Sequence, residues 1–158
     1  MKQRFSASID QIFSILTDPK WLEQRCLALG DIRCSGKKAK KGRAEVVKLK
    51  RTVHRKLPPL VSRVLRPDAE FEVEERWIEI EEGYRSDMNV IVAGLPVTLT
   101  AITTLSPKYD DCVVQIEHTC KIHVPLIGGA VEKFLLSQIH RECVAEFDYL
   151  EAYLEKNC

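Results

Sequence analysis

The sequence predicts an α+β fold, in which an antiparallel sheet of about seven strands packs against one long C-terminal helix. Three observations lead to this prediction. Two short helical segments follow the first strand, residues 31–124 alternate β-branched runs with turn residues, and residues 129–155 carry a helical apolar stripe. With 158 residues, we expect one domain that spans residues 1–158 and buries a sizeable core.

The N-terminal segment carries the start and stop signals of two consecutive helices. Residues 2–7 can form a first strand, and Ser8 then begins a capping box with Gln11. Asp18 can cap a second helix, with a proline at its first position, and this helix ends at Gly30. Because an Asp-Pro pair joins the two helices directly, we expect a bent pair.

Six further strands are expected in the central segment, near 31–36 and over 43–56, 70–81, 84–94, 97–106 and 112–124. Most connections between them are short, so neighbouring strands should pair in antiparallel order as a meander. Charge supports one of these pairings. Lys48 and Lys50 share a face of one strand, and a row of glutamates that begins at Glu70 shares a face of the next.

The C-terminal helix is expected from Gly129 to Glu155, a length on the order of 40 Å. Two short helices cannot cover so long an apolar stripe, so the helix must lie across the sheet. Gly128 and Gly129 stand where the chain reverses into this helix, and we expect one of them to have a positive φ or a tight backbone contact. A phosphate-binding loop is the alternative, but the glycine spacing is wrong and Glu132 would repel an anion.

Composition argues against several classes of partner. The chain has 24 Lys and Arg against 23 Asp and Glu, so nucleic acid is not expected as the main partner. The basic run Lys37 to Arg43 is interpreted as a solvated hairpin tip, with nucleic-acid or transient membrane-surface contact as the alternative. No apolar run reaches signal-peptide or membrane-span length, and the six cysteines lack zinc-like spacing. We therefore expect reduced thiols in the cytoplasm, no metal and no cofactor.

Two local markers and the order of the elements resemble a known superfamily. The first marker is FSASIDQIFSILTDPKWL, near the start, and the second is VPLIGGAVEKFLLSQI, where the long helix begins. The chain resembles the START and Bet v 1-like superfamily, whose helix-grip fold is shared by polyketide cyclases. The second marker is especially similar to one of its uncharacterised bacterial branches, a domain of unknown function. The resemblance implies a strongly curved sheet that grips the helix around an elongated apolar cavity. It carries over no catalytic residue, because the superfamily shares no catalytic motif.

Strand alternation and the helical projection predict which residues face that cavity. The expected ligand-binding residues are Leu49, Arg51, Val53, Phe71, Val73, Glu75, Trp77, Met88, Val90, Leu99, Ala101, Thr103, Ile116, His118, Cys120, Val131, Leu135, Ile139, Glu142 and Glu146. Charged groups among them must pair, reach water or meet a ligand, because a bare buried charge is costly. One interpretation is a structural ion pair such as Arg51–Glu75, and the other is a polar anchor for a bound molecule.

The loop from Leu57 to Ala69 is unusual because it combines prolines with several apolar residues. Alternation of the connections places it at the same end of the sheet as the Gly-Gly turn. The expected gate residues are Leu60, Val61, Val64, Leu65, Gly128 and Gly129. The loop is interpreted either as a plug over the sheet rim or as a mobile gate at the cavity mouth.

The sequence leaves three functions open. The first is binding or carriage of an apolar small molecule, lipid-like or polycyclic, without catalysis. The second is an enzyme of cyclase or aromatase type that uses Arg51, Glu75, His118 or Glu146 as acid–base groups, or a Cys120–His118 nucleophile. The third is a protein-interaction module with a vestigial cavity. No cluster of catalytic hydroxyls is obvious, which favours the first function over the second, and the apolar loop favours it over the third. The oligomeric state stays open.

Overall fold

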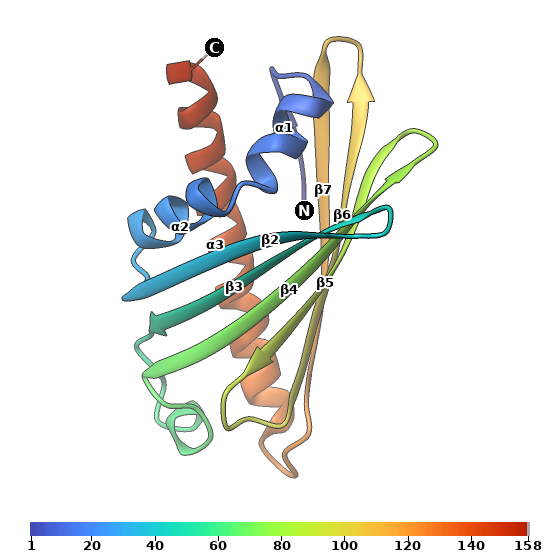
Figure 1. Ribbon diagram of the computed structural model, residues 1–158. Helices are drawn as coiled ribbons and strands as arrows, with labels where there is room; N and C mark the ends of the chain where they lie inside the picture. The colour runs from blue at the N-terminus through green and yellow to red at the C-terminus, as the bar shows by residue number, and fades with distance from the viewer. Residues whose placement is uncertain (158) are drawn as a thin grey trace.

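Seven strands form one antiparallel sheet that wraps around one side of a long helix (Figure 1). The computed structural model describes residues 1–157, and Cys158 lies outside the described residues. The strands are β1 (Lys2–Phe5), β2 (Arg33–Lys41), β3 (Ala44–His54), β4 (Asp68–Ile80), β5 (Gly83–Val92), β6 (Val97–Lys108) and β7 (Asp111–Ile122). The helices are α1 (Ile9–Leu16), α2 (Pro19–Ala28) and α3 (Gly128–Asn157), with a short 3-10 turn η1 (Val61–Arg63). The order across the sheet is β1-β7-β6-β5-β4-β3-β2, which confirms the predicted meander.

The two short helices begin at the predicted caps. Ser8 Oγ accepts a hydrogen bond from the Gln11 backbone N–H (3.3 Å), and the Ser8 N–H donates to Gln11 Oε1 (2.9 Å). Asp18 Oδ1 accepts from the backbone N–H of Lys20 (3.0 Å) at the start of α2. Gly30 follows the end of α2 with a φ of 104°, a conformation that favours glycine. The pair of helices therefore folds back over one end of the sheet, beside α3 (Figure 1).

Charge sets the register between β3 and β4, as the sequence predicted. Lys48 lies opposite Glu74 and Lys50 opposite Glu72. Lys50 Nζ is 2.8 Å from Glu72 Oε1, and Lys48 forms the equivalent pair with Glu74. Each exposed cross-strand pair contributes only about 0.2–1 kcal/mol. The pairs therefore select the register, and burial of the opposite face supplies most of the stability.

The basic run is exposed and ends in the β2–β3 hairpin, but the hairpin turn is shorter than predicted. Residues Lys37 to Lys41 belong to β2, and the turn is confined to Gly42 and Arg43. β2 is an edge strand of the sheet. Lysines on an edge strand oppose pairing with another chain, because a second strand would have to bury their charge. Protection of the edge explains the basic run without a nucleic-acid partner.

The reversal into α3 is tight at Gly128 and open at Gly129. A Cβ atom on Gly128 would lie 2.8 Å from the backbone oxygen of Ile122, whereas one on Gly129 would meet nothing within 4 Å. The positive φ in this turn, 68°, belongs to the exposed Leu126. The expected tight backbone contact is thus confirmed for Gly128, and the left-handed residue of the turn is a leucine.

The connections gather at two opposite ends of the sheet. The connection formed by residues 55–67, the β5–β6 turn and the β7–α3 turn lie at one end, which is lower in Figure 1. The turns of the β2–β3, β4–β5 and β6–β7 hairpins lie at the other end. The predicted grouping of the loop with the Gly-Gly turn is therefore correct.

The apolar core consists of two buried clusters. One surrounds Trp77 and Phe147 beneath α1 and α2, and the other surrounds Phe71 and Leu135 beside connection 55–67. Residues of both clusters line a cavity in the middle of the molecule. None of the helices in residues 1–157 is both long and apolar enough to cross a membrane.

Candidate functional site

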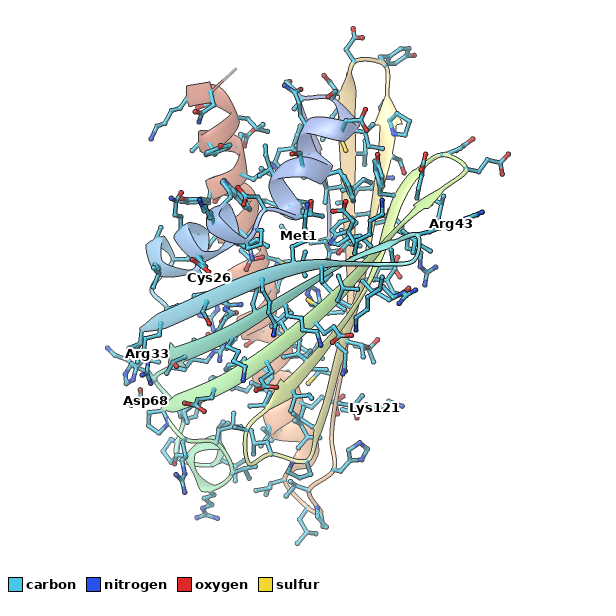
Figure 2. All side chains as sticks on the ribbon, in the orientation of Figure 1. Met1, Cys26, Arg33, Arg43, Asp68 and Lys121 are labelled. Atoms are coloured by element: carbon cyan, nitrogen blue, oxygen red, sulfur yellow. The ribbon has the colours of Figure 1, made fainter. Side chains whose placement is uncertain are left out.

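A cavity of about 160 Å³ lies between the inner face of the sheet and α3. Its walls come from β3 to β7, one side of α3, the end of α2 and connection 55–67. Figure 2 draws the side chains of the sheet and of the helices, many of which lie between the two. Successive strand residues point to opposite faces, so one apolar row of each strand is directed at α3. The cavity is therefore a direct product of strand alternation.

Most residues predicted to face the cavity line it, and three do not. Ala101, Cys120 and Val131 are buried, but they pack within the walls and do not reach the hollow. Alternation identifies the inner face of a strand. It does not identify which part of that face borders empty space, and for this reason the prediction is wrong at these three positions.

The cavity has further walls that the sequence prediction missed. Arg25 and Leu22 reach it from α2, and Leu57, Arg66 and Pro67 reach it from connection 55–67. Neither α2 nor connection 55–67 is a strand, so the alternation of strand residues could not predict which of their side chains line the cavity. These side chains reach it because both segments fold back over the ends of the sheet.

Three other missed residues had a usable signal. Arg55 continues the alternation of Arg51 and Val53 one step beyond the predicted list, and it lines the cavity. Cys143 and Phe147 lie on the apolar stripe of α3 and also line it. Extending the strand alternation by one step would have found Arg55, and the helical stripe predicted from the sequence already contains Cys143 and Phe147.

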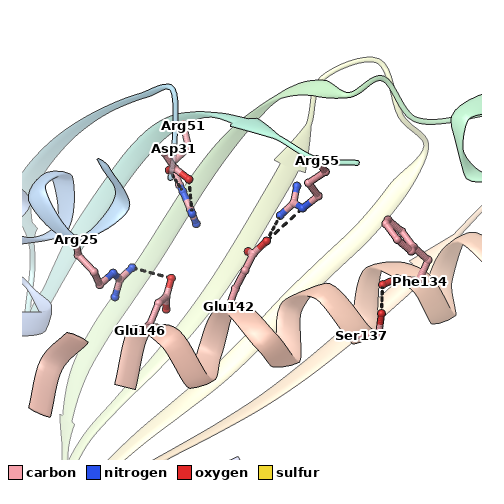
Figure 3. Close-up of polar contacts among 8 residues, drawn as sticks. All are labelled: Arg25, Asp31, Arg51, Arg55, Phe134, Ser137, Glu142 and Glu146. Atoms are coloured by element: carbon pink, nitrogen blue, oxygen red, sulfur yellow. Dashed lines mark hydrogen bonds and ion pairs between the residues drawn. The ribbon is translucent and has the colours of Figure 1, made fainter. Parts of the chain in front are cut away.

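Arg51 pairs with Asp31, so the predicted Arg51–Glu75 pair is wrong (Figure 3). Arg51 Nε donates to Asp31 Oδ2 (2.6 Å), and Nη2 donates to Oδ1 (3.0 Å). Burial of Arg51 opposes its charge, but the hydrogen bonds to Asp31 and the nearby negative charges leave its pKa raised. Asp31 lies in the turn between α2 and β2, so the alternation of strand residues could not predict it as the partner of Arg51.

Two more ion pairs tie α3 to its neighbours across the cavity (Figure 3). Arg25 Nη2 is 3.2 Å from Glu146 Oε1, and Arg55 Nη2 is 2.5 Å from Glu142 Oε1. The arginine side chains are only 12% and 13% exposed, which explains how two glutamates can lie within the apolar arc of α3. Arg25 Nε is also buried and has no hydrogen-bond partner among the described residues. It is a free donor at the cavity wall.

Glu75 brings an acid into the apolar interior. Ser86 Oγ donates a hydrogen bond to Glu75 Oε1 at 2.6 Å, and Ser86 is itself fully buried. Burial raises the pKa of Glu75, and the hydrogen bond from Ser86 opposes this rise only in part. Glu75 therefore keeps its proton to a higher pH than an ordinary glutamate does. In that neutral state it can donate a hydrogen bond.

The sulfur that His118 contacts belongs to Cys143 of α3 and not to Cys120, which follows His118 on β7. His118 Nε2 lies 3.8 Å from Cys143 Sγ. Burial lowers the pKa of His118, and burial also raises the pKa of Cys143 to about 12. A thiol with a raised pKa stays protonated and is a poor nucleophile. The suggested Cys120–His118 nucleophile gains no support, because Cys120 does not line the cavity.

Connection 55–67 covers one end of the cavity. Val61 and Leu65 are 3% and 6% exposed and pack in the same cluster as Val131 and Leu135. Leu65 lines the cavity, whereas Leu60 is 40% exposed and points away from it. The loop therefore acts as a plug in this conformation.

An open groove of about 630 Å³ runs beside the cavity, between the end of β3, connection 55–67 and α3. Arg51, Val53, Arg55 and Glu142 line both the groove and the cavity. The Arg55–Glu142 ion pair thus stands at the boundary between the two spaces. No sequence pattern indicates this side opening, because the residues of its walls are far apart along the chain.

Metal-ligating side chains gather outside the cavity lining, although no metal was expected. Cys26, Asp31 and Cys34 each offer one ligand atom, and these atoms all lie within 4.8 Å of one another. The cysteines among residues 1–157 are free thiols. Spacing along the chain did not suggest this trio, since its members come from a helix, a turn and a strand.

Comparisons with known proteins agree with this geometry. The sequence profile of a family described as "Protein of unknown function (DUF2505)" matches residues 1–154. An uncharacterized protein of Mycobacterium tuberculosis strain ATCC 25618 / H37Rv is 26% identical over 132 residues, which cover 82% of this chain and 76% of that protein.

Solved structures show the same architecture. A START superfamily protein from Mycobacterium smegmatis aligns with a TM-score of 0.63 at 13% identity, over 100% of this chain and 97% of that chain. A conserved protein from Geobacillus kaustophilus aligns with a TM-score of 0.63 at 13% identity, over 98% and 93% of the two chains. These likenesses confirm the predicted START-like helix-grip fold.

Proposed function

The chain belongs to the DUF2505 family, and we propose that it binds a small molecule with an apolar body and a few oxygen atoms in the cavity beneath α3. One observation supports this most: the centre of an otherwise packed core is hollow, and its apolar walls carry a few directed polar groups. Such a combination is typical of small-molecule sites. Lipid-like and polycyclic molecules both meet this description.

The charges around the cavity favour an uncharged ligand. Three of the four arginines that line the cavity are paired with a carboxylate, and the fourth, Arg66, is exposed at the end of connection 55–67. The buried walls therefore carry little net charge. The groups left over include hydrogen-bond donors, namely Arg25 Nε, Trp77 Nε1 and, in its neutral form, the carboxyl of Glu75. A carbonyl or hydroxyl oxygen on the ligand would satisfy such donors.

The size of the cavity implies movement. Drug-sized ligands occupy sites of roughly 300–1,000 Å³, whereas this cavity measures about 160 Å³. We propose that a larger ligand enters from the side groove, after the Arg55–Glu142 pair separates. Connection 55–67 begins at Arg55, so displacement of the predicted gate would open the same boundary.

The test is binding of a neutral apolar dye, N-phenyl-1-naphthylamine, to the purified protein. Met88 lines the cavity from β5, whereas Ile91 on the same strand is 58% exposed on the outer face. Met88→Trp should fill the hollow and weaken dye binding about tenfold or more, and the control Ile91→Trp should leave it unchanged. Ile139→Trp fills the cavity from α3 and serves if Met88→Trp does not fold. Equal binding by the parent and both folded cavity variants would contradict the proposal. As a separate measurement, native mass spectrometry of freshly purified protein would identify any molecule that stays bound.

Acid–base catalysis on the bound molecule is a second candidate, which the raised pKa of Glu75 favours. A carboxyl whose pKa is raised above its ordinary value is better suited to act as a general acid than an ordinary glutamate is. If the captured molecule is converted, Glu75→Gln should retain binding and lose conversion. Unchanged conversion by this variant would exclude Glu75 as the acid.

A further inference from the structure

Three side chains suited to a metal ion converge between α2 and the edge of the sheet. Cys26 comes from the last turns of α2, Asp31 from the following turn and Cys34 from β2 (Figure 2 labels Cys26). Cys26 is 1% exposed and the Asp31 side chain is 4% exposed. Their ligand atoms and that of Cys34 lie within 4.8 Å of one another. The cluster is therefore built into the fold and is not a chance grouping of surface residues.

The backbone brings these groups together through one tight reversal. Gly30 adopts its left-handed conformation just after α2, and the backbone N–H of Asp31 then donates to the carbonyl of Cys26 (3.0 Å). Three residues further along the chain, Cys34 lies on β2 directly opposite Arg51 of β3. Paired residues on adjacent strands share a face, so Cys34 and Arg51 are both on the side that α2 covers.

We propose that Cys26, Asp31 and Cys34 form a binding site for a thiophilic divalent cation of the zinc class. Two thiolates and a carboxylate are ligand types that zinc prefers, and a tetrahedral ion needs them roughly 3.5–4 Å apart. The observed spacing thus requires only small side-chain adjustments.

The charge balance of the loaded site supports this assignment. A divalent cation with two thiolates and one carboxylate has a net charge of −1. The guanidinium of Arg51, which donates to both oxygens of Asp31, adds one positive charge and makes the buried assembly neutral. A carboxylate oxygen has lone pairs for both a metal and a hydrogen bond, so Arg51 can orient Asp31 without displacing the ion. Binding releases the protons of the thiols to solvent.

Three protein ligands leave one position of a tetrahedral ion free. Structural zinc sites are usually closed by four protein ligands, whereas sites that meet a water molecule or a substrate keep one position open. Asp31 and Arg51 also line the side groove. The open position would therefore be held close to a space that admits solvent or a small molecule. This inference does not depend on the proposed function of the cavity.

Cobalt(II) provides a direct test, because thiolate ligands give it an intense near-ultraviolet charge-transfer band and tetrahedral geometry gives it strong visible bands. We expect the reduced full-length protein to bind one equivalent of Co²⁺ with both signals and to release it when Zn²⁺ is added. Cys34→Ser should lose part of the charge-transfer intensity, because the Cys26 thiolate remains, and should weaken binding about tenfold or more. Asp31→Asn should also weaken binding. Cys112→Ser, which changes a buried free thiol on β7 outside the cavity lining, is the matched control and should bind as the parent does.

Thermal unfolding separates metal loss from misfolding. Zn²⁺ should raise the melting temperature of the parent and of Cys112→Ser, but not that of a folded Cys34→Ser variant. The proposal would be overturned if the reduced parent shows no thiolate-to-cobalt band, or if Cys34→Ser binds Co²⁺ as tightly as the parent. A Cys26–Cys34 disulfide in protein purified under reducing conditions would overturn it as well.

Discussion

Glu75 illustrates how burial of one residue can link stability, pH and binding. Its carboxyl accepts a hydrogen bond from Ser86 inside a largely apolar cavity, and burial raises its pKa above the ordinary value of 4.5. Keeping a charged carboxylate there would be costly, so the neutral form is favoured. The same proton that relieves the folded protein of a buried charge also provides a hydrogen-bond donor for a ligand.

The pH dependence of this cost has a definite sign. Between the unfolded pKa, about 4.5, and the raised folded pKa, the folded protein keeps a proton that the unfolded chain releases. Stability therefore falls as pH rises through this interval. Glu75→Gln removes the effect, so its melting temperature should exceed that of the parent at neutral pH, and the gain should shrink towards about pH 4. Thermal unfolding at both pH values measures this.

Glu72 offers a control with the opposite sign. It lies on the outer face of β4, and its hydrogen bond with Lys50 lowers its pKa. Glu72→Gln should therefore lose stability at neutral pH, and this loss should vanish as the carboxyl is protonated at low pH. A pH-independent gain for Glu75→Gln would show that Glu75 is not a titrating, destabilised acid.

At the scale of single elements, the start of α3 depends on one glycine. The helix must leave β7 and return at once across the sheet, and the backbone of Gly128 passes close to the carbonyl of Ile122. A side chain at this point would push the helix away from the strand. The next glycine has open space around it, so two adjacent and chemically identical residues are under different constraints.

Gly128→Ala and Gly129→Ala form a matched pair that tests this difference. Gly128→Ala should lower the free energy of unfolding by about 1–3 kcal/mol, the usual range for overpacking. Gly129→Ala should be neutral or stabilising by about 0.5–1 kcal/mol, because alanine favours the helix. Urea unfolding followed by circular dichroism provides the measurement. Equal effects at both positions would show that backbone contact does not constrain the turn.

At the scale of the whole molecule, the two ends of the sheet have different roles. One end is closed by α1 and α2, and the other by connection 55–67, which places Val61 and Leu65 in the core and leaves Leu60 exposed. Few buried contacts hold this connection, so local opening should cost less here than in the sheet. The turns of the β2–β3, β4–β5 and β6–β7 hairpins and the edge strand β2 contribute no residue to the cavity lining.

Hydrogen exchange should therefore respond to a ligand at one end only. On binding of N-phenyl-1-naphthylamine, we expect slower amide exchange in residues 60–66 and unchanged exchange in the β2–β3 hairpin around residues 37–42. The physical reason is that a bound molecule adds contacts beneath Leu65, which lines the cavity. If exchange slows in the hairpin and stays unchanged in residues 60–66, the entrance lies at the hairpin end of the sheet and the prediction is wrong.

The sequence alone determined the parts of this fold that depend on local chemistry and simple periodicity. Ser8 and Asp18 fixed the helix starts, alternation fixed the inner face of each strand, and the charges of Lys50 and Glu72 fixed a register. Caps, periods and opposite charges act between residues that are near in sequence or directly paired. Such interactions can be inferred without knowing the shape of the molecule.

Only the tertiary structure decided which side chains meet across the interior. The sequence could not show that Arg51 pairs with Asp31 of a distant turn, that Cys26 meets Cys34, or that Ala101 packs where no hollow exists. These outcomes depend on the depth of a side chain and on the curvature that brings separate elements together. Periodicity gives the direction of a side chain but not its depth or its neighbour on another element.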